Sequence, residues 1–422
     1  MAAARIAVVG GGLSGLAAAQ RLNAEGYAVE LFERSRLLGG RATSFEVGGE
    51  TVDNGQHVYL ACCTQFIEFI DRAGMAAALR LQDRFDVAVY SRDGKFSRLR
   101  AARLPAPLHL LASFIAYRHL SWRGKLQVAR ALLRLKCDPD AAQSAPSFGG
   151  WLQSQGQSDE TVCSFWEPFM VPALNAPLDQ MNAAEAAFVV STAFLSDSGA
   201  ARFGYSSVPL AEIMEAAARP LDSVHRSTAV LGVEADDRIS LRSSSGTAAF
   251  DGAVVAVSPA ALRRLLGEPQ RFGIGGLDAY ESFPIVDAHL WHDRGTLDFD
   301  FAAILDSPVQ WVFQKRAGYL CCSLSAVQEW ASEPSASLAQ RMWEEVRRAL
   351  PQLASAKLLR SAVTRNPEGT YLVKPGAKRP GARTAHPKLT IAGSWTETGW
   401  PDTMESAVRS GETAAQSLME RL

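Results

Sequence analysis

No stretch of this 422-residue chain holds the roughly 18 uninterrupted apolar residues that a membrane-spanning helix needs. Cysteine is scarce: the six present include no C-x-x-C spacing, so we expect neither a disulfide framework nor a metal site. Neither charge sign dominates, with 43 Lys+Arg against 44 Asp+Glu, which excludes a disordered or globally nucleic-acid-binding chain. The start M-A-A-A-R-I-A-V-V-G lacks the small-residue cleavage site of a secretory leader. These absences favour a protein of the reducing cytosol.

The chain does have the length and the 47% hydrophobic content for two or three domains with a large core. It opens with a strand at 5–9, a helix at 13–25 and a strand at 28–32, which together predict a βαβ unit. Further along, turn residues predict hairpins at 44–53 and around Asp93-Gly94, and periodicity predicts helices at 64–74 and 335–350. A helical stretch at 104–196 is predicted to break at Pro146, Pro168, Pro172 and Pro177. The rest of the chain predicts strands within 223–257, a mixed aromatic-rich region at 283–330, a strand at 389–392 and a helix at 403–420.

This alternation predicts a mixed α/β fold in which a cofactor domain is assembled from separate parts of the chain. We expect that domain to comprise residues 1–80, 220–275 and 380–422. Residues 81–219 then form a helical insertion, and residues 276–379 form a substrate domain.

A glycine loop lies between the first predicted strand and helix. Gly10, Gly12 and Gly15 spell G-x-G-x-x-G, and Glu33 ends the next strand. Such glycines permit a tight turn, close approach of backbone to a pyrophosphate, and close helix–sheet packing, and the acid accepts hydrogen bonds from a ribose. The free N–H groups and dipole of the helix N-terminus favour phosphate. The pattern therefore predicts a dinucleotide site, and the acid disfavours NADP.

The next residues distinguish FAD from NAD. Gly39-Gly40-Arg41 follows in L-F-E-R-S-R-L-L-G-G-R, and this extended pattern resembles the flavin-containing amine oxidase and phytoene desaturase superfamily. The resemblance implies a Rossmann-like FAD-binding domain in which the second glycine pair and the arginine approach the FAD pyrophosphate. A second glycine cluster, at 273–276, follows no apolar strand, so we expect no second dinucleotide site.

The C-terminal segment I-A-G-S-W-T-E-T-G-W-P-D-T-M-E-S-A-V-R-S-G resembles the same superfamily, where it contacts the FAD phosphate and faces the flavin. Matching the resemblance by position implies cofactor contacts for Gly393, Ser394, Trp400, Thr403 and Met404. Ser394 departs from the pattern, because relatives usually carry Asp or Glu there. Asp402-x-x-Glu405 has the spacing of a capping box and predicts the helix start.

A narrower resemblance rests on V-D-N-G-Q-H (52–57), on the C-terminal segment and on R-P-G-A-R (379–383). Together these are similar to the squalene-associated FAD-dependent desaturases, whose assigned activity is hydroxysqualene dehydroxylation in bacterial squalene and hopanoid biosynthesis. The resemblance implies a long apolar isoprenoid substrate, loss of an allylic hydroxyl as water, and hydride delivery from reduced flavin. It leaves the electron donor unidentified.

Polar residues in the 52–57 motif are the candidates for catalysis. The superfamily runs this segment near the flavin ring, which makes His57, Asp53 and Gln56 candidate catalytic residues. His57 is the best proton donor or acceptor of the three by intrinsic pKa. A turn that caps its own backbone explains Asp53-Asn54-Gly55 equally well. The remaining candidate FAD contacts are Leu13, Ser14, Arg34, Asn54 and Gly55.

Residues 92–136 are strongly basic, with Asp93 as their single acidic residue. They surround the apolar segment 104–117, and Arg123, Arg130 and Arg134 fall on one helical stripe. This arrangement suits docking on anionic lipid, so we expect a cytoplasmic protein that binds the inner face of the cytoplasmic membrane peripherally. A solvated face around an ordinary core helix is the alternative. Nucleic acid is not an expected partner, because no recognition motif is present.

Three functions remain open on the sequence alone. The first is an FAD-dependent oxidoreductase that reduces hydroxysqualene to squalene. The second is a related flavoenzyme, either a polyprenoid desaturase of the phytoene type or an amine oxidase. The third is a non-enzymatic prenyl-chain carrier, against which the intact glycines, Glu33 and the C-terminal segment argue.

Overall fold

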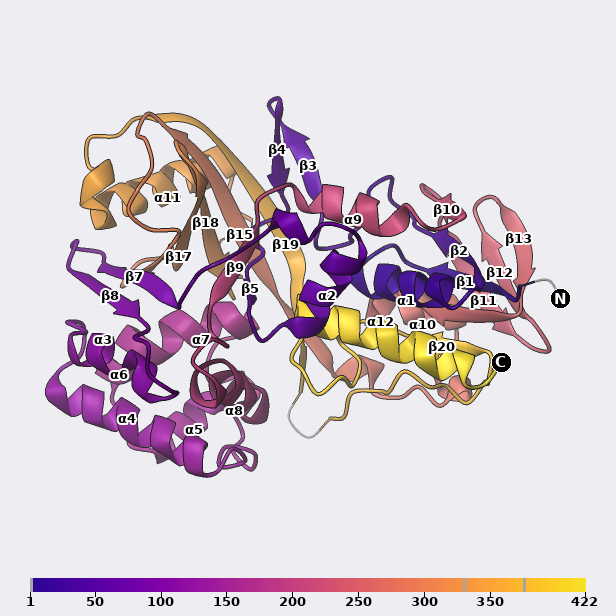
Figure 1. The fold of residues 1–422 in the computed structure, drawn as a ribbon, viewed down its shortest axis with the longest axis horizontal. Coiled ribbons are helices and arrows are strands. Elements are labelled where there is room, and N and C mark those ends of the chain that lie inside the picture. Colours follow the sequence, from indigo (N-terminus) through magenta and orange to yellow (C-terminus); the bar gives the residue numbers. More distant parts are fainter. Residues whose placement is uncertain (1–2, 329, 331, 375–376) are drawn as a thin grey trace.

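A five-stranded parallel sheet draws its strands from both ends and the middle of the chain (Figure 1). In this computed structural model, which describes residues 3–328, 330, 332–374 and 377–422, the strand order is β10-β2-β1-β14-β20. Every neighbouring pair is parallel. The strands are β1 (Arg5–Val9), β2 (Ala28–Phe32), β10 (Ser223–His225), β14 (Gly252–Val255) and β20 (Leu389–Ile391). The predicted βαβ opening is confirmed.

Helices and a small sheet cover the two faces of this parallel sheet. One face packs against helices from distant parts of the chain, which share a core with Ile6 and Val8 of β1. These helices are α1 (Leu13–Ala24), α2 (Thr64–Arg72), α9 (Leu210–Ala218) and α12 (Met404–Met419). The other face packs against α10 (Pro259–Leu266) and an antiparallel sheet of β11 (Val230–Ala235), β12 (Ile239–Ser243) and β13 (Gly246–Phe250).

A second, seven-stranded sheet forms the other half of the molecule, at the left in Figure 1. Its order is β19 (Leu358–Val373), β15 (Tyr280–His292), β18 (Tyr319–Ser325), β17 (Trp311–Arg316), β16 (Phe301–Leu305), β7 (Asp86–Ser91) and β8 (Phe96–Arg100). Strands β7 and β8, which fall within the range 81–219, join this sheet because β7 pairs in parallel with β16. The domain boundaries themselves stay a prediction.

The two faces of this sheet carry different cores. Val286, Ala288 and Leu290 point to α11 (Ser335–Ala349), while Trp291, Trp311 and Phe313 point to the helical region. That region contains α3 (Leu111–Ile115), α4 (Trp122–Cys137), α5 (Phe148–Ser154), α6 (Asp159–Thr161), α7 (Glu167–Leu174) and α8 (Ala183–Val190). Two short ribbons, β3–β4 (Ser44–Val47, Glu50–Asp53) and β5–β9–β6 (Tyr59–Leu60, Phe203–Ser206, Leu79–Leu81), complete the fold.

Two of the predicted helix breaks are wrong. Helix α7 runs through both Pro168 and Pro172. Pro168 is tolerated because it occupies the first turn, where a missing N–H costs little. Pro172 removes an interior hydrogen bond, but Met170, Val171 and Leu174 are buried and hold the helix in the core.

Among the described residues, no helix combines the length and the apolar character required to cross a bilayer.

Candidate functional site

Glycines make the turn from β1 into α1 possible. Gly10 has a φ of 105°, and an added Cβ would lie 2.2 Å from the Ala256 carbonyl oxygen. At Gly15 an added Cβ would lie 1.8 Å from the Gly10 carbonyl oxygen. Only glycine fits these two positions, because the neighbouring backbone cannot move away.

Gly12 differs from these two glycines because the space beside it is open. The nearest heavy atom to an added Cβ there is Gly40 Cα, at 3.9 Å. The two glycine loops face each other, since the Gly39 N–H donates to the Gly11 carbonyl oxygen at 2.7 Å. Helix α1 begins after Gly12 without a side-chain cap, and Leu13 and Ser14 form its buried first turn. This exposed backbone and uncapped helix start could hold a phosphate group.

The two glycine loops and the start of α1 together form a cradle for phosphate. Backbone groups fix Glu33 beside this cradle. Its Oε2 accepts from the Gly11 N–H at 2.7 Å, and its Oε1 accepts from the Ser35 N–H at 2.7 Å. The side chain is 9% exposed, so the carboxylate retains access for a further hydrogen bond. Arg34, by contrast, is exposed at the surface.

Arg41 joins the N-terminal loops to the C-terminal segment. Its guanidinium donates to both carboxylate oxygens of Asp402, at 2.9 and 3.0 Å, and to Ser394 Oγ at 2.7 Å. Burial alone would raise the pKa of Asp402, but Arg41 and the Tyr371 N–H hold that pKa below its usual range. The resemblance predicted an acidic residue at position 394, where this chain has serine. Asp402 therefore supplies a carboxylate beside the cradle in place of the missing acid.

Asp402 and Glu405 do not form the predicted capping box. The cap of α12 is Thr403, whose hydroxyl accepts from the Ser406 N–H at 3.3 Å. Glu405 instead accepts from the Gln65 and Phe66 N–H groups, at 3.2 and 2.8 Å, and so caps α2. The capping-box spacing was misleading because both carboxylates serve other segments.

The two chain ends also meet through small residues. Ser410 Oγ accepts from the Gly393 N–H at 3.0 Å and lies 3.2 Å from Ser14 Oγ. An added Cβ at Gly411 would lie 2.2 Å from the Ser14 carbonyl oxygen, so α12 and α1 touch backbone to backbone. Of the other predicted contacts, Met404 opens α12 and Trp400 packs edge-on against Phe188 with ring centroids 5.2 Å apart.

Asp53 is held firmly by its neighbours. Its Oδ1 accepts from Ser44 Oγ at 2.7 Å and from the Leu210 N–H at 2.9 Å, while Oδ2 forms an ion pair with Lys315. Burial acts to raise the pKa of Asp53, but Lys315 and these hydrogen bonds lower it below its usual value. An ionised, fully paired carboxylate favours a structural role over proton donation.

The rest of the motif forms a tight turn. Gly55 has a φ of 85°, and Asn54 Nδ2 donates to the Arg41 carbonyl oxygen at 3.1 Å. His57 Nε2 lies 3.0 Å from the Asn54 carbonyl oxygen, and burial lowers the pKa of His57 despite the nearby Asp53. Within the described part of the chain, Gln56 Nε2 is buried with no hydrogen-bond partner, as is Thr43 Oγ1. These two unsatisfied polar atoms, one in the motif and one just after the second glycine loop, fit a bound polar group that the protein alone does not supply.

Sequence reasoning missed two charged residues that meet this motif. Lys315 on β17 pairs with Asp53, and Asp287 on β15 lies against Gly55, where an added Cβ would be 2.4 Å from Asp287 Oδ2. Burial raises the pKa of Asp287 to about 6. A lone carboxylate in the apolar run F-P-I-V-D-A-H-L-W was a signal for Asp287, whereas nothing in W-V-F-Q-K-R marked Lys315.

An apolar cavity of about 300 Å³ lies within the helical region. Aromatic and aliphatic side chains from α3, α4, α7 and the segments around them form its wall, and Lys136 is its one charged lining residue. The lining includes Phe85, Leu108, Leu111, Phe114, Leu132, Leu133, Phe165, Trp166, Phe169, Met170 and Phe194. Such walls suit a hydrocarbon chain.

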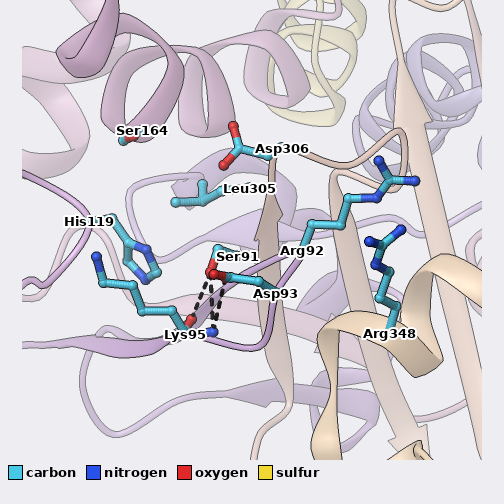
Figure 2. A pocket seen from close by; sticks show the side chains of 9 residues that line it. All are labelled: Ser91, Arg92, Asp93, Lys95, His119, Ser164, Leu305, Asp306 and Arg348. Atoms are coloured by element: carbon cyan, nitrogen blue, oxygen red, sulfur yellow. Dashed lines mark hydrogen bonds between the residues drawn. The ribbon is translucent and has the colours of Figure 1, made fainter.

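A second cavity, of about 400 Å³, is lined mainly by polar and charged side chains (Figure 2). Arg92, Lys95, His119, Asp306 and Arg348 contribute to it. None of the residues that line it belongs to the glycine loops, the 52–57 motif or the C-terminal segment. Its charged walls do not suit an apolar ligand.

Known proteins resemble this chain along its whole length. A sequence model of the family described as "Flavin containing amine oxidoreductase" matches residues 13–419. The zeta-carotene desaturase of Synechocystis sp. is 23% identical over 480 residues, with 98% of this chain and 97% of that protein covered. The hydroxysqualene dehydroxylase of Zymomonas mobilis is 23% identical over 430 residues, with 97% of each covered.

Solved structures show the same fold. Wild-type putrescine oxidase bound to putrescine superposes with a TM-score of 0.76 at 16% identity, covering 100% of both chains. A putative protoporphyrinogen oxidase from Exiguobacterium sp. 255-15 gives a TM-score of 0.73, also at 16% identity and full coverage. The predicted α/β fold of the amine oxidase type is confirmed.

The position of Glu33 predicts weaker FAD retention in Glu33→Ala. Removing a carboxylate that hydrogen-bonds ribose hydroxyls costs about 1.5–3 kcal/mol per bond, so the FAD dissociation constant should rise at least about tenfold. Titration of apoprotein with FAD, followed by flavin fluorescence, measures this. Glu30→Ala is the matched control on the same strand, because Glu30 pairs with Arg5 instead. Equal FAD affinity in Glu33→Ala and wild type would contradict the assignment.

Proposed function

Because the chain belongs to the flavin-containing amine oxidoreductase family and is an FAD-dependent oxidoreductase, we propose that it reduces hydroxysqualene to squalene. The observation that carries the proposal is an apolar cavity that opens among exposed leucines. The similarity to hydroxysqualene dehydroxylase supports the same substrate class.

The two glycine loops are proposed to hold the FAD pyrophosphate. Open backbone at Gly12 and the uncapped start of α1 offer N–H donors, and Glu33 is placed for the ribose. Arg41 adds positive charge beside Gly40, although Asp402 already neutralises much of it. The unsatisfied Thr43 Oγ1 and Gln56 Nε2 place free polar groups along the path from the cradle to the 52–57 motif.

The cavity is proposed to take the hydrocarbon chain of the substrate. Lys136 is the one charged residue among those that line the cavity. Its positive charge would repel a protonated amine, which disfavours an amine oxidase. Apolar walls bind an isoprenoid by the hydrophobic effect and exclude water from the reacting end. Bound FAD supplies two-electron hydride chemistry. The protein's part is to orient the carbinol, keep the cavity dry and provide a proton.

The mouth of the cavity coincides with an exposed apolar patch. Leu108, Leu111 and Leu133 line the cavity and are also 50%, 48% and 60% exposed. Exposed apolar residues close by in the sequence are Leu104, Ile115, Trp122 and Leu126, and the exposed arginines among them are Arg103, Arg118, Arg123, Arg130 and Arg134. This docking patch is proposed to bind the inner face of the cytoplasmic membrane and to admit substrate from the lipid.

A polyprenoid desaturase is the second candidate. Carotene and phytoene desaturases match this chain at 22–24% identity, and the same cavity would accept their apolar substrates. The two candidates differ in direction, because a desaturase removes hydrogen from a chain and needs an oxidant, whereas the proposed enzyme needs a reductant.

Product analysis tests the proposed reaction. The FAD-loaded enzyme, reduced under anaerobic conditions and mixed with hydroxysqualene in detergent, should form one squalene per flavin. Gas chromatography with mass spectrometry identifies the product, and enzyme left oxidised is the control. A new double bond or a ketone formed only with an oxidant would instead support a desaturase or an alcohol oxidase.

The docking patch predicts binding to anionic vesicles. Replacing Arg123, Arg130 and Arg134 with Glu should weaken sedimentation with phosphatidylglycerol vesicles, and the effect should shrink at high salt. The control carries the same charge change at Arg238 in the turn before β12, Arg242 on β12 and Arg264 on α10, elements that lie far from α4 in the molecule (Figure 1). Equal loss of binding in both triple variants would show that net charge, not this patch, binds lipid.

A further inference from the structure

Asp287 lies on the face of the seven-stranded sheet that looks toward the helical region. Across the sheet its neighbours are Thr364 on β19 and Ser323 on β18, and Ser323 in turn pairs with Trp311 on β17. Trp311 touches Phe169, a wall of the apolar cavity, with ring centroids 5.8 Å apart. Two strand spacings, about 10 Å, separate Asp287 from Trp311. The carboxyl therefore lies at one end of a row of neighbouring side chains, Asp287, Ser323, Trp311 and Phe169, and Phe169 at the other end lines the cavity.

Asp287 is buried and incompletely satisfied. The residue is 3% exposed, and its Oδ1 has no hydrogen-bond partner in the described part of the chain. No described cation forms an ion pair with it. A buried carboxylate without a counter-ion is costly, so burial shifts the equilibrium of this group toward the neutral acid.

The same carboxyl touches the 52–57 motif. Only glycine fits at position 55 beside Asp287 Oδ2, and the Gln56 backbone N–H hydrogen-bonds to Asp287. Gln56 also carries a buried side-chain Nε2 without a partner. An unsatisfied amide donor and an unsatisfied carboxyl on residues in contact match an alcohol, whose oxygen accepts from both.

We propose that Asp287 and Gln56 bind the substrate hydroxyl and that Asp287 is its proton donor, an inference that rests on the proposed function. The protonated carboxyl transfers its proton to the hydroxyl oxygen as the allylic C–O bond breaks with its electron pair, and water leaves. Bound anionic dihydroflavin would supply the hydride that the carbon gains and would be oxidised by two electrons to neutral flavin. Asp287 is left as carboxylate and regains a proton from solvent, so atoms and charge balance.

Among the ionisable side chains that surround Asp287, the carboxyl of Asp287 itself is the one that titrates near neutral pH. On β18, Tyr319 and Cys321 lie on the same face as Asp287 and Cys322 lies on the opposite face, and burial keeps all three neutral by raising their pKa. On β15, burial lowers the pKa of His289 to about 4, and burial also lowers that of His57 in the motif, so both imidazoles favour the neutral form. Lys315 and Asp53 neutralise each other. Because the reaction needs the acid form, the rate should fall as pH rises through the pKa of Asp287.

The test compares single turnovers of the FAD-loaded, reduced enzyme with hydroxysqualene between pH 5 and 8. Asp287→Asn keeps the shape of the side chain but removes its acidic proton. In this variant the rate of flavin reoxidation should fall by about 10²–10⁴-fold and should no longer depend on pH. Asp300→Asn is the matched control, since burial also raises the pKa of Asp300 but that residue lies off this row. Wild-type rates and an unchanged pH profile in Asp287→Asn would overturn the proposal.

A binding measurement with oxidised enzyme gives a readout besides turnover. A squalene-length amine replaces the alcohol, and flavin absorbance follows its binding at pH 8. Asp287→Asn should weaken binding of the ammonium by roughly 10- to 100-fold while changing that of the alcohol less than about threefold. Unchanged amine affinity would show that Asp287 does not face the substrate. If wild-type enzyme makes no squalene, the proposed function and the proton transfer are both wrong, and the amine measurement alone decides whether Asp287 lines the site.

Discussion

An ion pair between Arg41, whose side chain is 33% exposed, and the buried Asp402 joins parts of the chain that are 361 residues apart. The Asp402 side chain is 1% exposed and also accepts from the Tyr371 N–H, so the pair ties the second glycine loop, β19 and the start of α12 together. Removing Arg41 would leave the buried Asp402 carboxylate without its counter-ion, which costs about 3–5 kcal/mol in a fully buried pair and less here because solvent reaches Arg41. The cradle therefore forms only once both ends of the chain are in place.

That dependence explains which parts of the fold could be predicted. Local signals were strong wherever a segment's own residues decide its structure: Gly10, Gly12 and Gly15 marked the first turn, and Gly48-Gly49 marked the β3–β4 hairpin. Signals failed where tertiary contacts decide. Pro168 and Pro172 lie in a helix that core packing sustains, and β7 joins β16 across more than 200 residues of sequence.

The site divides in the same way. The glycine cradle and Glu33 lie together as the sequence motifs suggested, because a βαβ unit is a local structure. The sequence did not show which residues the motifs contact: Asp402 beside Arg41, Lys315 beside Asp53, and Asp287 beside Gly55 come from distant strands and loops. Burial and pairing give the two carboxyl groups different states. Asp53 is ionised and paired, whereas one oxygen of Asp287 is unsatisfied.

The proposed substrate site thus has a polar end, where Gly55, Gln56 and Asp287 meet, and an apolar end, which is the cavity lined by leucines of α3 and α4. A crystal structure of the FAD-loaded enzyme with a squalene-length alcohol tests this directly. The account predicts pyrophosphate density beside Gly12, the hydroxyl within hydrogen-bonding distance of Asp287, and the chain running past Trp311 into the cavity of the helical region. A hydroxyl bound away from Asp287, or a chain that avoids that cavity, would contradict it.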